Sequence, residues 1–167
     1  MRIAVCPGSF DPMTLGHLDI IVRASAMFDL VIAAVSRNPI KNPLFSIEER
    51  VEMLSEVLEP YKNVKVDSFH GLTVYFAAEQ NAVAIVRGLR VVSDFEDEFR
   101  MALINKTLDS SIDTMFLMTS AENSFISSSA VKDVAYFNGP LERLVPPLVV
   151  KRLEDKLKDG SDFCKEE

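Results

Sequence analysis

The residues best suited to chemistry lie near the start of the chain, where Ser9, Thr14, Gly16 and His17 follow a short apolar run at 3–6. Thr14 and His17 are three residues apart, so their side chains share one face at a helix start. Gly16 between them lets a ligand approach the backbone closely. A hydroxyl, an imidazole and free helix amides at one point favour a phosphate that gains charge during a reaction. The alternative is that His17 is only a polar residue near a helix start.

Positive side chains stand where two further loops are expected. Arg87 comes directly after the apolar run 82–86 and Arg90 follows it, so their planar guanidinium groups can hold phosphate in bidentate fashion. Lys41 lies in a loop between two prolines and offers a single cation. The alternatives are a salt bridge at the edge of the sheet for Arg87 and exposure to solvent for Lys41. As a group, these cations favour an anionic ligand.

Three consecutive serines, Ser127, Ser128 and Ser129, stand at another expected helix start. Their hydroxyl groups, with the free N–H groups of the helix, predict a second anion site. A plain N-cap is the alternative, and it accounts well for one serine but poorly for the other two. Lys132, one turn further on, either adds positive charge to this site or lies in solvent.

Five apolar runs alternate with helical patterns, and several of these runs carry no polar alternation, which is typical of a sheet covered on both faces. The sequence predicts an α/β fold with a doubly wound, mostly or wholly parallel five-stranded sheet. We expect one domain over 1–158, followed by a polar tail at 159–167 that is expected to be frayed. Ligands of such folds bind beyond the carboxyl ends of the strands. The expected strands are 3–6, 30–35, 63–67, 82–86 and 112–118, and the loops expected to carry the site are 7–17, 36–44, 68–73, 87–92 and 119–128.

Local patterns predict the helix boundaries and part of the core. A first helix begins around 16, and further helices are expected at 46–58, 72–80, 93–108, 127–137 and 147–157. Two pairs with capping-box spacing, Ser46 with Glu49 and Ser93 with Glu96, mark two of the helix starts. The aromatic residues expected in the core are Phe69, Phe76, Phe95, Phe99 and Phe116.

Composition narrows the class of protein. The chain has 167 residues, of which 48% are hydrophobic and 26% charged, as in a globular protein. Its net charge of −7 and the lack of a basic cluster argue against nucleic acid as the main partner. No signal peptide or membrane-length apolar run is apparent, and Cys6 and Cys164 are too scattered for a zinc site, so a cytoplasmic location is expected. The P-loop, GxGxxG and GxSxG motifs are missing.

The motifs together point to a known family. Ser-Phe-Asp-Pro at 9–12 and Thr-Leu-Gly-His at 14–17 resemble the T/HxGH signature of the nucleotidylyltransferase superfamily. Phe-Ser-Ile-Glu-Glu-Arg at 45–50, Arg-Gly-Leu-Arg at 87–90, Asp-Phe-Glu at 94–96 and Ser-Phe-Ile-Ser-Ser-Ser at 124–129 follow in the order of bacterial phosphopantetheine adenylyltransferases. The resemblance to that family covers about residues 1–158.

This resemblance implies a reaction. The phosphate of 4′-phosphopantetheine attacks the α-phosphorus of ATP in line, giving dephospho-CoA and pyrophosphate in CoA biosynthesis. Mg²⁺ is expected on the ATP phosphates, without a protein cage, and a homohexamer is the expected assembly. Two alternatives remain: another phosphorylated acceptor such as nicotinamide mononucleotide, or a non-catalytic nucleotide-binding module.

The resemblance also implies the roles of individual residues. His17 would stabilise the transition state. The family pattern departs at three positions, where Asp97, Asn123 and Tyr136 replace a tyrosine, an aromatic residue and an arginine; altered affinity or regulation is expected there rather than lost activity. The substrate would be held by Ser9, Lys41, Thr73 and Arg87, and ATP by Ser9, Phe10, His17, Gly88, Leu89, Arg90, Glu98, Asn123, Ser124, Phe125, Ile126, Ser127, Ser128 and Ser129.

Overall fold

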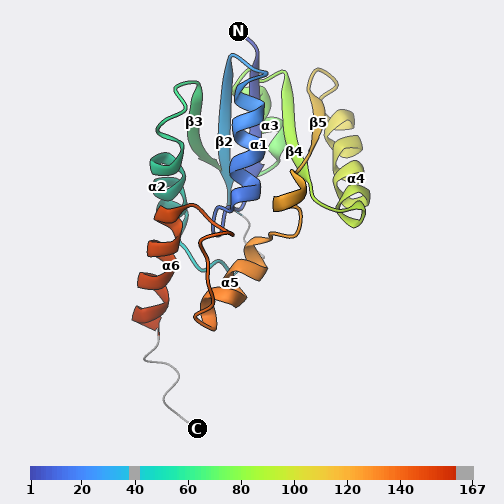
Figure 1. Cartoon of the computed structure of the whole chain (residues 1–167). Coiled ribbons are helices and arrows are strands. Elements are labelled where there is room, and N and C mark those ends of the chain that lie inside the picture. Colours follow the sequence, from blue (N-terminus) through green and yellow to red (C-terminus); the bar gives the residue numbers. More distant parts are fainter. Residues whose placement is uncertain (38–41, 161–167) are drawn as a thin grey trace.

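A five-stranded sheet forms the centre of the protein, and all of its strands run parallel (Figure 1). The computed structural model describes residues 1–37 and 42–160. The strand order is β3-β2-β1-β4-β5, so the chain builds outward from β1 on one side and then on the other. This is the doubly wound architecture that the sequence predicted. The strands are β1 (Ile3–Gly8), β2 (Leu30–Ser36), β3 (Val64–Phe69), β4 (Ala84–Leu89) and β5 (Asp113–Met118).

Helices cover both faces of the sheet (Figure 1). Alternate residues of a strand point to opposite faces. Ala4 and Cys6 of β1 therefore belong to the larger core, whereas Ile3 and Val5 belong to a second core. None of the helices in the described part of the chain has the length and hydrophobicity that a bilayer crossing requires. The helices are α1 (Leu15–Ser25), α2 (Ile47–Leu58), α3 (Thr73–Glu79), α4 (Val92–Leu108), the 3₁₀ turn η1 (Ala121–Asn123), α5 (Ser128–Tyr136) and α6 (Pro147–Gly160).

The strands next to the site are longer than the sequence suggested. β1 continues through Pro7 to Gly8, which pair with Ala34 and Val35 of β2. β4 continues into the predicted loop at 87–92 as far as Leu89, which pairs with Met118 of β5. The prediction of a loop from 87 is therefore wrong, because pairing with β5 keeps the chain extended there. As a result the side chain of residue 87 starts from the rigid sheet rather than from a turn.

One of the two predicted capping boxes is present. Ser46 Oγ accepts a hydrogen bond from the N–H of Glu49 (3.2 Å), and Glu49 Oε2 accepts one from the N–H of Ser46 (2.7 Å). The box predicted at 93 and 96 is wrong, because α4 begins earlier with Val91 as its N-cap and without a side-chain cap. Asp94 Oδ2 instead accepts a hydrogen bond from the N–H of Arg90 (3.3 Å), just before the helix.

The orientation of α4 contradicts part of the predicted core. Phe69 and Phe76 are buried as expected, but Phe95 and Phe99 are 43% and 45% exposed. The reason is that α4 turns Asp94 and Glu98 toward the cavity, so Phe95 and Phe99 stay partly exposed, although Phe95 still contacts Phe116 of β5. α6 runs two residues into the predicted tail, whose remainder at 161–167 lies outside the described residues.

Candidate active site

A cavity of about 480 Å³ opens at the carboxyl ends of the central strands β1 and β4. The strand order changes direction between these two strands, which is where doubly wound folds bind ligands. Gly8 and Ser9 come from the end of β1, and Arg87 and Gly88 from β4. The first turn of α1, the inner face of α4 and the segment after β5 complete the walls. The position therefore agrees with the expectation from the sequence.

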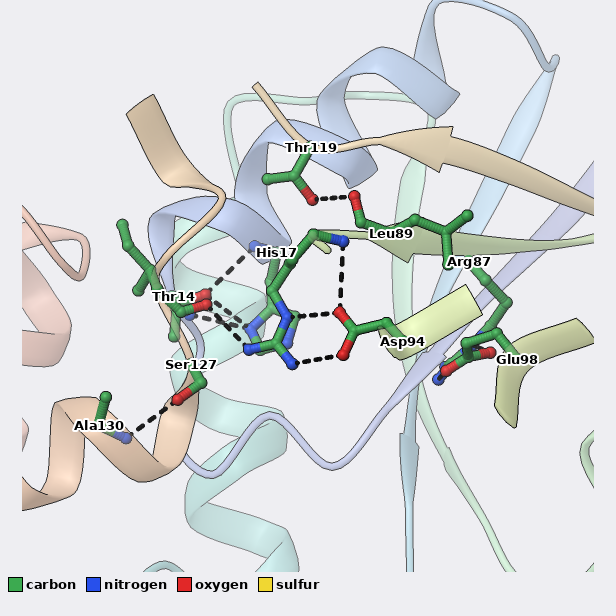
Figure 2. A network of polar contacts seen from close by, with 11 residues as sticks. Thr14, His17, Arg87, Leu89, Asp94, Glu98, Thr119, Ser127 and Ala130 are labelled. Carbon is green, nitrogen blue, oxygen red and sulfur yellow. Dashed lines mark hydrogen bonds and ion pairs between the residues drawn. The ribbon is translucent and has the colours of Figure 1, made fainter. Parts of the chain in front are cut away.

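His17 lies in the cavity wall in a defined protonation state. Thr14 is the N-cap of α1, and its N–H donates a hydrogen bond to Nδ1 of His17 (3.1 Å), as Figure 2 shows. Because Nδ1 accepts, the proton of the neutral ring is on Nε2. Burial, together with the positive charges of Arg87 and Arg90, lowers the pKa of His17 to about 4. At neutral pH the ring is therefore an uncharged donor through Nε2.

Arg87 is held by a carboxylate and still has donors to spare. Its Nε donates to Glu98 Oε2 (2.7 Å), its Nη2 donates to Glu98 Oε1, and its Nη1 donates to the carbonyl oxygen of Pro7 (2.6 Å). Figure 2 shows Arg87 beside Glu98. The salt bridge considered from the sequence is thus present. A guanidinium group has five N–H donors, and these contacts use three of them. Two N–H groups remain for an anionic ligand in the cavity.

Arg90 is paired in the same way. Its Nε and Nη2 donate to the two oxygens of Asp94 (3.1 and 3.2 Å), and its Nη1 donates to the carbonyl oxygen of Ile126 (3.3 Å). Asp94 and Glu98 are four residues apart, so one face of α4 supplies both carboxylates. Figure 2 shows Asp94 on the side of His17 and Glu98 beside Arg87. The inner face of α4 therefore fixes both arginines.

The three serines at the start of α5 have different surroundings. Ser127 is the N-cap, and its Oγ accepts a hydrogen bond from the N–H of Ala130 (3.1 Å). Ser128 lines the cavity, and its Oγ donates to the carbonyl oxygen of Pro12 (2.8 Å). Ser129 is exposed. The plain N-cap accounts for the first serine, whereas the second joins α5 to the loop after β1.

Comparison with known proteins identifies the family. A family model described as cytidylyltransferase-like matches residues 5–134. The phosphopantetheine adenylyltransferase of Carboxydothermus hydrogenoformans is 58% identical over 161 residues, which cover 96% of this chain and 99% of that one. The protein of the same name from Desulforamulus reducens is 56% identical over 160 residues, with coverage of 96% and 99%. The chain belongs to the phosphopantetheine adenylyltransferase family.

Membership of the phosphopantetheine adenylyltransferase family makes this protein a nucleotidyltransferase. A solved structure from Vibrio parahaemolyticus, assigned as a nicotinate-nucleotide adenylyltransferase, superposes with a TM-score of 0.71. It covers 92% of this chain and 99% of its own, at 19% sequence identity. At 19% identity the similarity supports a shared fold and carries no statement about function.

The cavity brings together many of the residues that the resemblance to phosphopantetheine adenylyltransferases suggested. Leu89 is buried in β4 and does not line the cavity. Lys41 lies outside the described residues. The predicted residues in the cavity wall are Ser9, Phe10, His17, Thr73, Arg87, Gly88, Arg90, Glu98, Ile126 and Ser128, and those away from it are Asn123, Ser124, Phe125, Ser127 and Ser129.

Two charged residues that the sequence analysis quoted only as parts of family motifs, without a role of their own, support the phosphopantetheine adenylyltransferase site. Arg50 of α2 is only 5% exposed, and its Nη1 donates to the carbonyl oxygen of Ser9 (2.8 Å). Asp11 is also buried and accepts hydrogen bonds from the N–H groups of Leu44 (3.0 Å) and Phe45 (2.9 Å). An arginine in the first turn of an amphipathic helix has the pattern of a solvated residue, so the sequence carried no signal of its burial.

Lys132 completes this support. Its Nζ lies 2.9 Å from Oδ2 of Asp11, so α5 is tied to the loop after β1. The sequence left open whether Lys132 adds charge to an anion site or lies in solvent. Neither alternative describes it fully, because its charge is used to pair a buried carboxylate.

Proposed function

We propose that the protein transfers the adenylyl group of ATP to 4′-phosphopantetheine, giving dephospho-CoA and pyrophosphate in CoA biosynthesis. The observation that carries the proposal is the identity of 52–58% to phosphopantetheine adenylyltransferases over nearly the whole chain. The cavity supports it chemically, because it combines a neutral histidine donor with an arginine that has free N–H groups.

The proposed reaction is a single in-line displacement. An oxygen of the acceptor phosphate forms a bond to the α-phosphorus of ATP, and the bond from that phosphorus to the oxygen bridging to the β-phosphate breaks. The electron pair leaves with pyrophosphate, so no covalent intermediate with the enzyme is required. Negative charge grows on the oxygens of the α-phosphate, where Nε2–H of His17 donates a hydrogen bond that strengthens in the transition state. Catalysis then rests on positioning and charge stabilisation.

The remaining roles follow from the charges around the cavity. Arg87, with Lys41 and Ser9, is proposed to bind the acceptor phosphate, and Thr73 the pantetheine arm. Arg90 and residues 123–129 are proposed to bind ATP. Among the described residues, no group of three or more acidic, histidine or cysteine side chains could form a metal cage. We propose that magnesium enters as MgATP, held by the nucleotide phosphates.

The test is pyrophosphate release from MgATP with 4′-phosphopantetheine, nicotinamide mononucleotide or buffer as the acceptor. Release that depends on phosphopantetheine is the expected result. Release with nicotinamide mononucleotide alone would keep the reaction type and overturn the proposed roles of Arg87 and Lys41. Binding of ATP without release in any mixture would instead favour a non-catalytic nucleotide-binding module.

Cytoplasmic location stays a prediction from the sequence.

We also propose self-assembly through the outer face of α4, with the homohexamer as the expected state. Large apolar side chains are exposed on this helix, and an apolar strip of this kind favours a protein interface. Phe95 packs edge-on against Phe116 of β5, with ring centroids 6.1 Å apart, yet these side chains of α4 stay 40–54% exposed, so we propose a second copy as their cover. The exposed residues are Phe95, Phe99, Leu103, Ile104 and Leu108, whereas Met101, although exposed, lines the cavity.

Replacing Phe99 by aspartate is expected to lower the mass of the assembly, because a charge would have to be buried at the interface. Sedimentation equilibrium measures the mass directly. Phe137→Asp is the matched control, because Phe137 is also exposed but lies at the end of α5. Equal masses for wild type and the Phe99 variant would contradict the role of α4.

A further inference from the structure

Two charged residues of α1, Asp19 and Arg23, connect this helix to the segment that follows β5. Asp19 Oδ2 accepts a hydrogen bond from the N–H of Ser120 (3.2 Å). Arg23 Nη1 donates to the carbonyl oxygen of Met118 (2.6 Å) and to Asp19 Oδ2 (3.2 Å). The pair thus holds the backbone on both sides of Thr119, a residue of the cavity wall. Neither Asp19 nor Arg23 lines the cavity itself.

The segment held by this pair has little else to fix it. The 3₁₀ turn η1 contains no buried residue, and Phe125 beyond it is 69% exposed. Residues 120–125 make their other hydrogen bonds within 120–126, for example from Asn123 Nδ2 to Ser120 Oγ (2.9 Å). Within residues 1–37 and 42–160, the bond to Asp19 is the one hydrogen bond that joins residues 120–125 to the rest of the fold.

The two ends of the segment are anchored to other elements. At one end Thr119 donates to the carbonyl oxygen of Leu89 through its N–H (2.8 Å) and its Oγ1 (3.0 Å), the latter drawn in Figure 2. At the other end Arg90 donates to the carbonyl oxygen of Ile126 (3.3 Å). Both of these anchors come from the β4 side of the cavity. Among the hydrogen bonds of the described residues, those of the α1 pair are the ones that join the segment to the helix that carries His17.

The same place is also where α1 and the segment approach each other. A Cβ atom added to Gly16 would lie 3.5 Å from the carbonyl oxygen of Asn123 and 3.6 Å from Cγ2 of Thr119. These are ordinary packing distances, so the start of α1 and the segment are already adjacent. Asp19 is two residues after His17 on the same helix, so a movement of the segment relative to Asp19 is also a movement relative to His17.

We propose that Asp19 and Arg23 are positioning residues that hold residues 119–126 against α1 and so set the distance between His17 and the nucleotide. Hydrogen bonds to charged groups are stronger than neutral ones. A few of them can therefore fix a segment that makes few other hydrogen bonds to the rest of the fold. The inference rests on the proposed function in one respect, namely that residues 123–129 contact ATP. The positions of 119–126 relative to α1 can be tested without that assumption.

Asp19→Asn is the decisive variant, because it removes the charge with little change of size. Its KM for ATP is expected to rise about tenfold, the loss of one charge-assisted hydrogen bond, while its KM for phosphopantetheine stays within about twofold. Asp19→Glu retains the charge and is expected to recover part of the ATP affinity. Glu59→Gln is the matched control, because it removes an exposed carboxylate at the C-cap of α2, paired with Lys62, and should change neither constant. Equal increases of both KM values in Asp19→Asn would overturn the proposal.

Amide hydrogen exchange provides a readout that does not depend on activity. In Asp19→Asn, exchange at 120–125 is expected to become faster, whereas exchange in β4 stays as in the wild type. Unchanged exchange at 120–125 would overturn the inference whatever the kinetic result. If wild-type protein released no pyrophosphate with any acceptor, the proposed function would fail, and the exchange measurement would still decide the role of Asp19.

Discussion

Replacing His17 by asparagine is expected to lower kcat on the order of 10²–10³-fold and to leave ATP affinity nearly unchanged. The shorter amide can still accept the N–H of Thr14, which preserves the start of α1. It cannot reach the position of Nε2, so the donor to the α-phosphate is lost. Pre-steady-state and steady-state kinetics with saturating ATP measure the effect on kcat, and calorimetric titration measures ATP affinity.

Two further substitutions separate the roles of the ring nitrogens. His17→Ala should lose a similar factor in kcat and should in addition be less stable, because α1 loses half of its capping box. His17→Gln, whose amide reaches closer to the place of Nε2, should retain more activity than His17→Asn. A fall in ATP affinity with kcat unchanged would mean that His17 binds the ground state. In that case the assignment of His17 to the transition state would be wrong.

The neutral state of His17 is a result that the sequence could not provide. The pattern Thr-Leu-Gly-His placed Thr14 and His17 on one face of a helix start, and they are in contact there. The direction of the contact, with Nδ1 as acceptor, depends on the backbone geometry of the cap. The low pKa depends on burial and on two arginines some 70 residues later in the chain. Local spacing predicts neighbours, whereas protonation depends on the whole fold.

The sheet could be predicted because its information is local. Apolar runs bounded by turn residues located all five strands, and the lack of alternation indicated a sheet covered on both faces. The predicted ends of β1 and β4 were wrong, because hydrogen bonding to a neighbouring strand decides where a strand ends more than the local residue types do. Pro7 and Gly8 look like a strand end, and Arg87 looks like a loop residue, yet all three lie in β1 or β4 because a neighbouring strand holds them.

α4 could not be oriented from its sequence because its pattern contradicts the usual rule. Phe95 and Phe99 have the spacing of a core face, but the cavity requires Asp94 and Glu98 to face inward. Burial of Arg50 is a related case, since its partners are carbonyl oxygens such as that of Ser9, which every residue possesses. A hydrogen bond to a backbone carbonyl does not depend on the type of the residue that carries it. The role of Arg50 could therefore not be predicted from the sequence and is seen only in the structure.

Removing Arg87 is expected to impair the acceptor far more than ATP. Arg87→Ala should raise KM for phosphopantetheine on the order of 10²-fold, because two charge-assisted hydrogen bonds to phosphate are lost. A second effect adds to the first. Glu98 loses its partner and leaves an unpaired carboxylate beside the incoming phosphate, which repels it. The KM for ATP should change much less, since Arg90 remains paired with Asp94.

The double variant Arg87→Ala with Glu98→Gln separates these two effects. If repulsion by the unpaired carboxylate contributes, neutralising Glu98 should recover roughly tenfold of the lost acceptor affinity, a coupling that a double-mutant cycle measures. Glu98→Gln alone should weaken acceptor binding modestly, because Arg87 keeps its charge but loses half of its support. Equal increases in both KM values in Arg87→Ala would remove Arg87 from the acceptor site. Full additivity of the two changes would show that Glu98 does not act through Arg87 and would make it an independent ligand-binding residue.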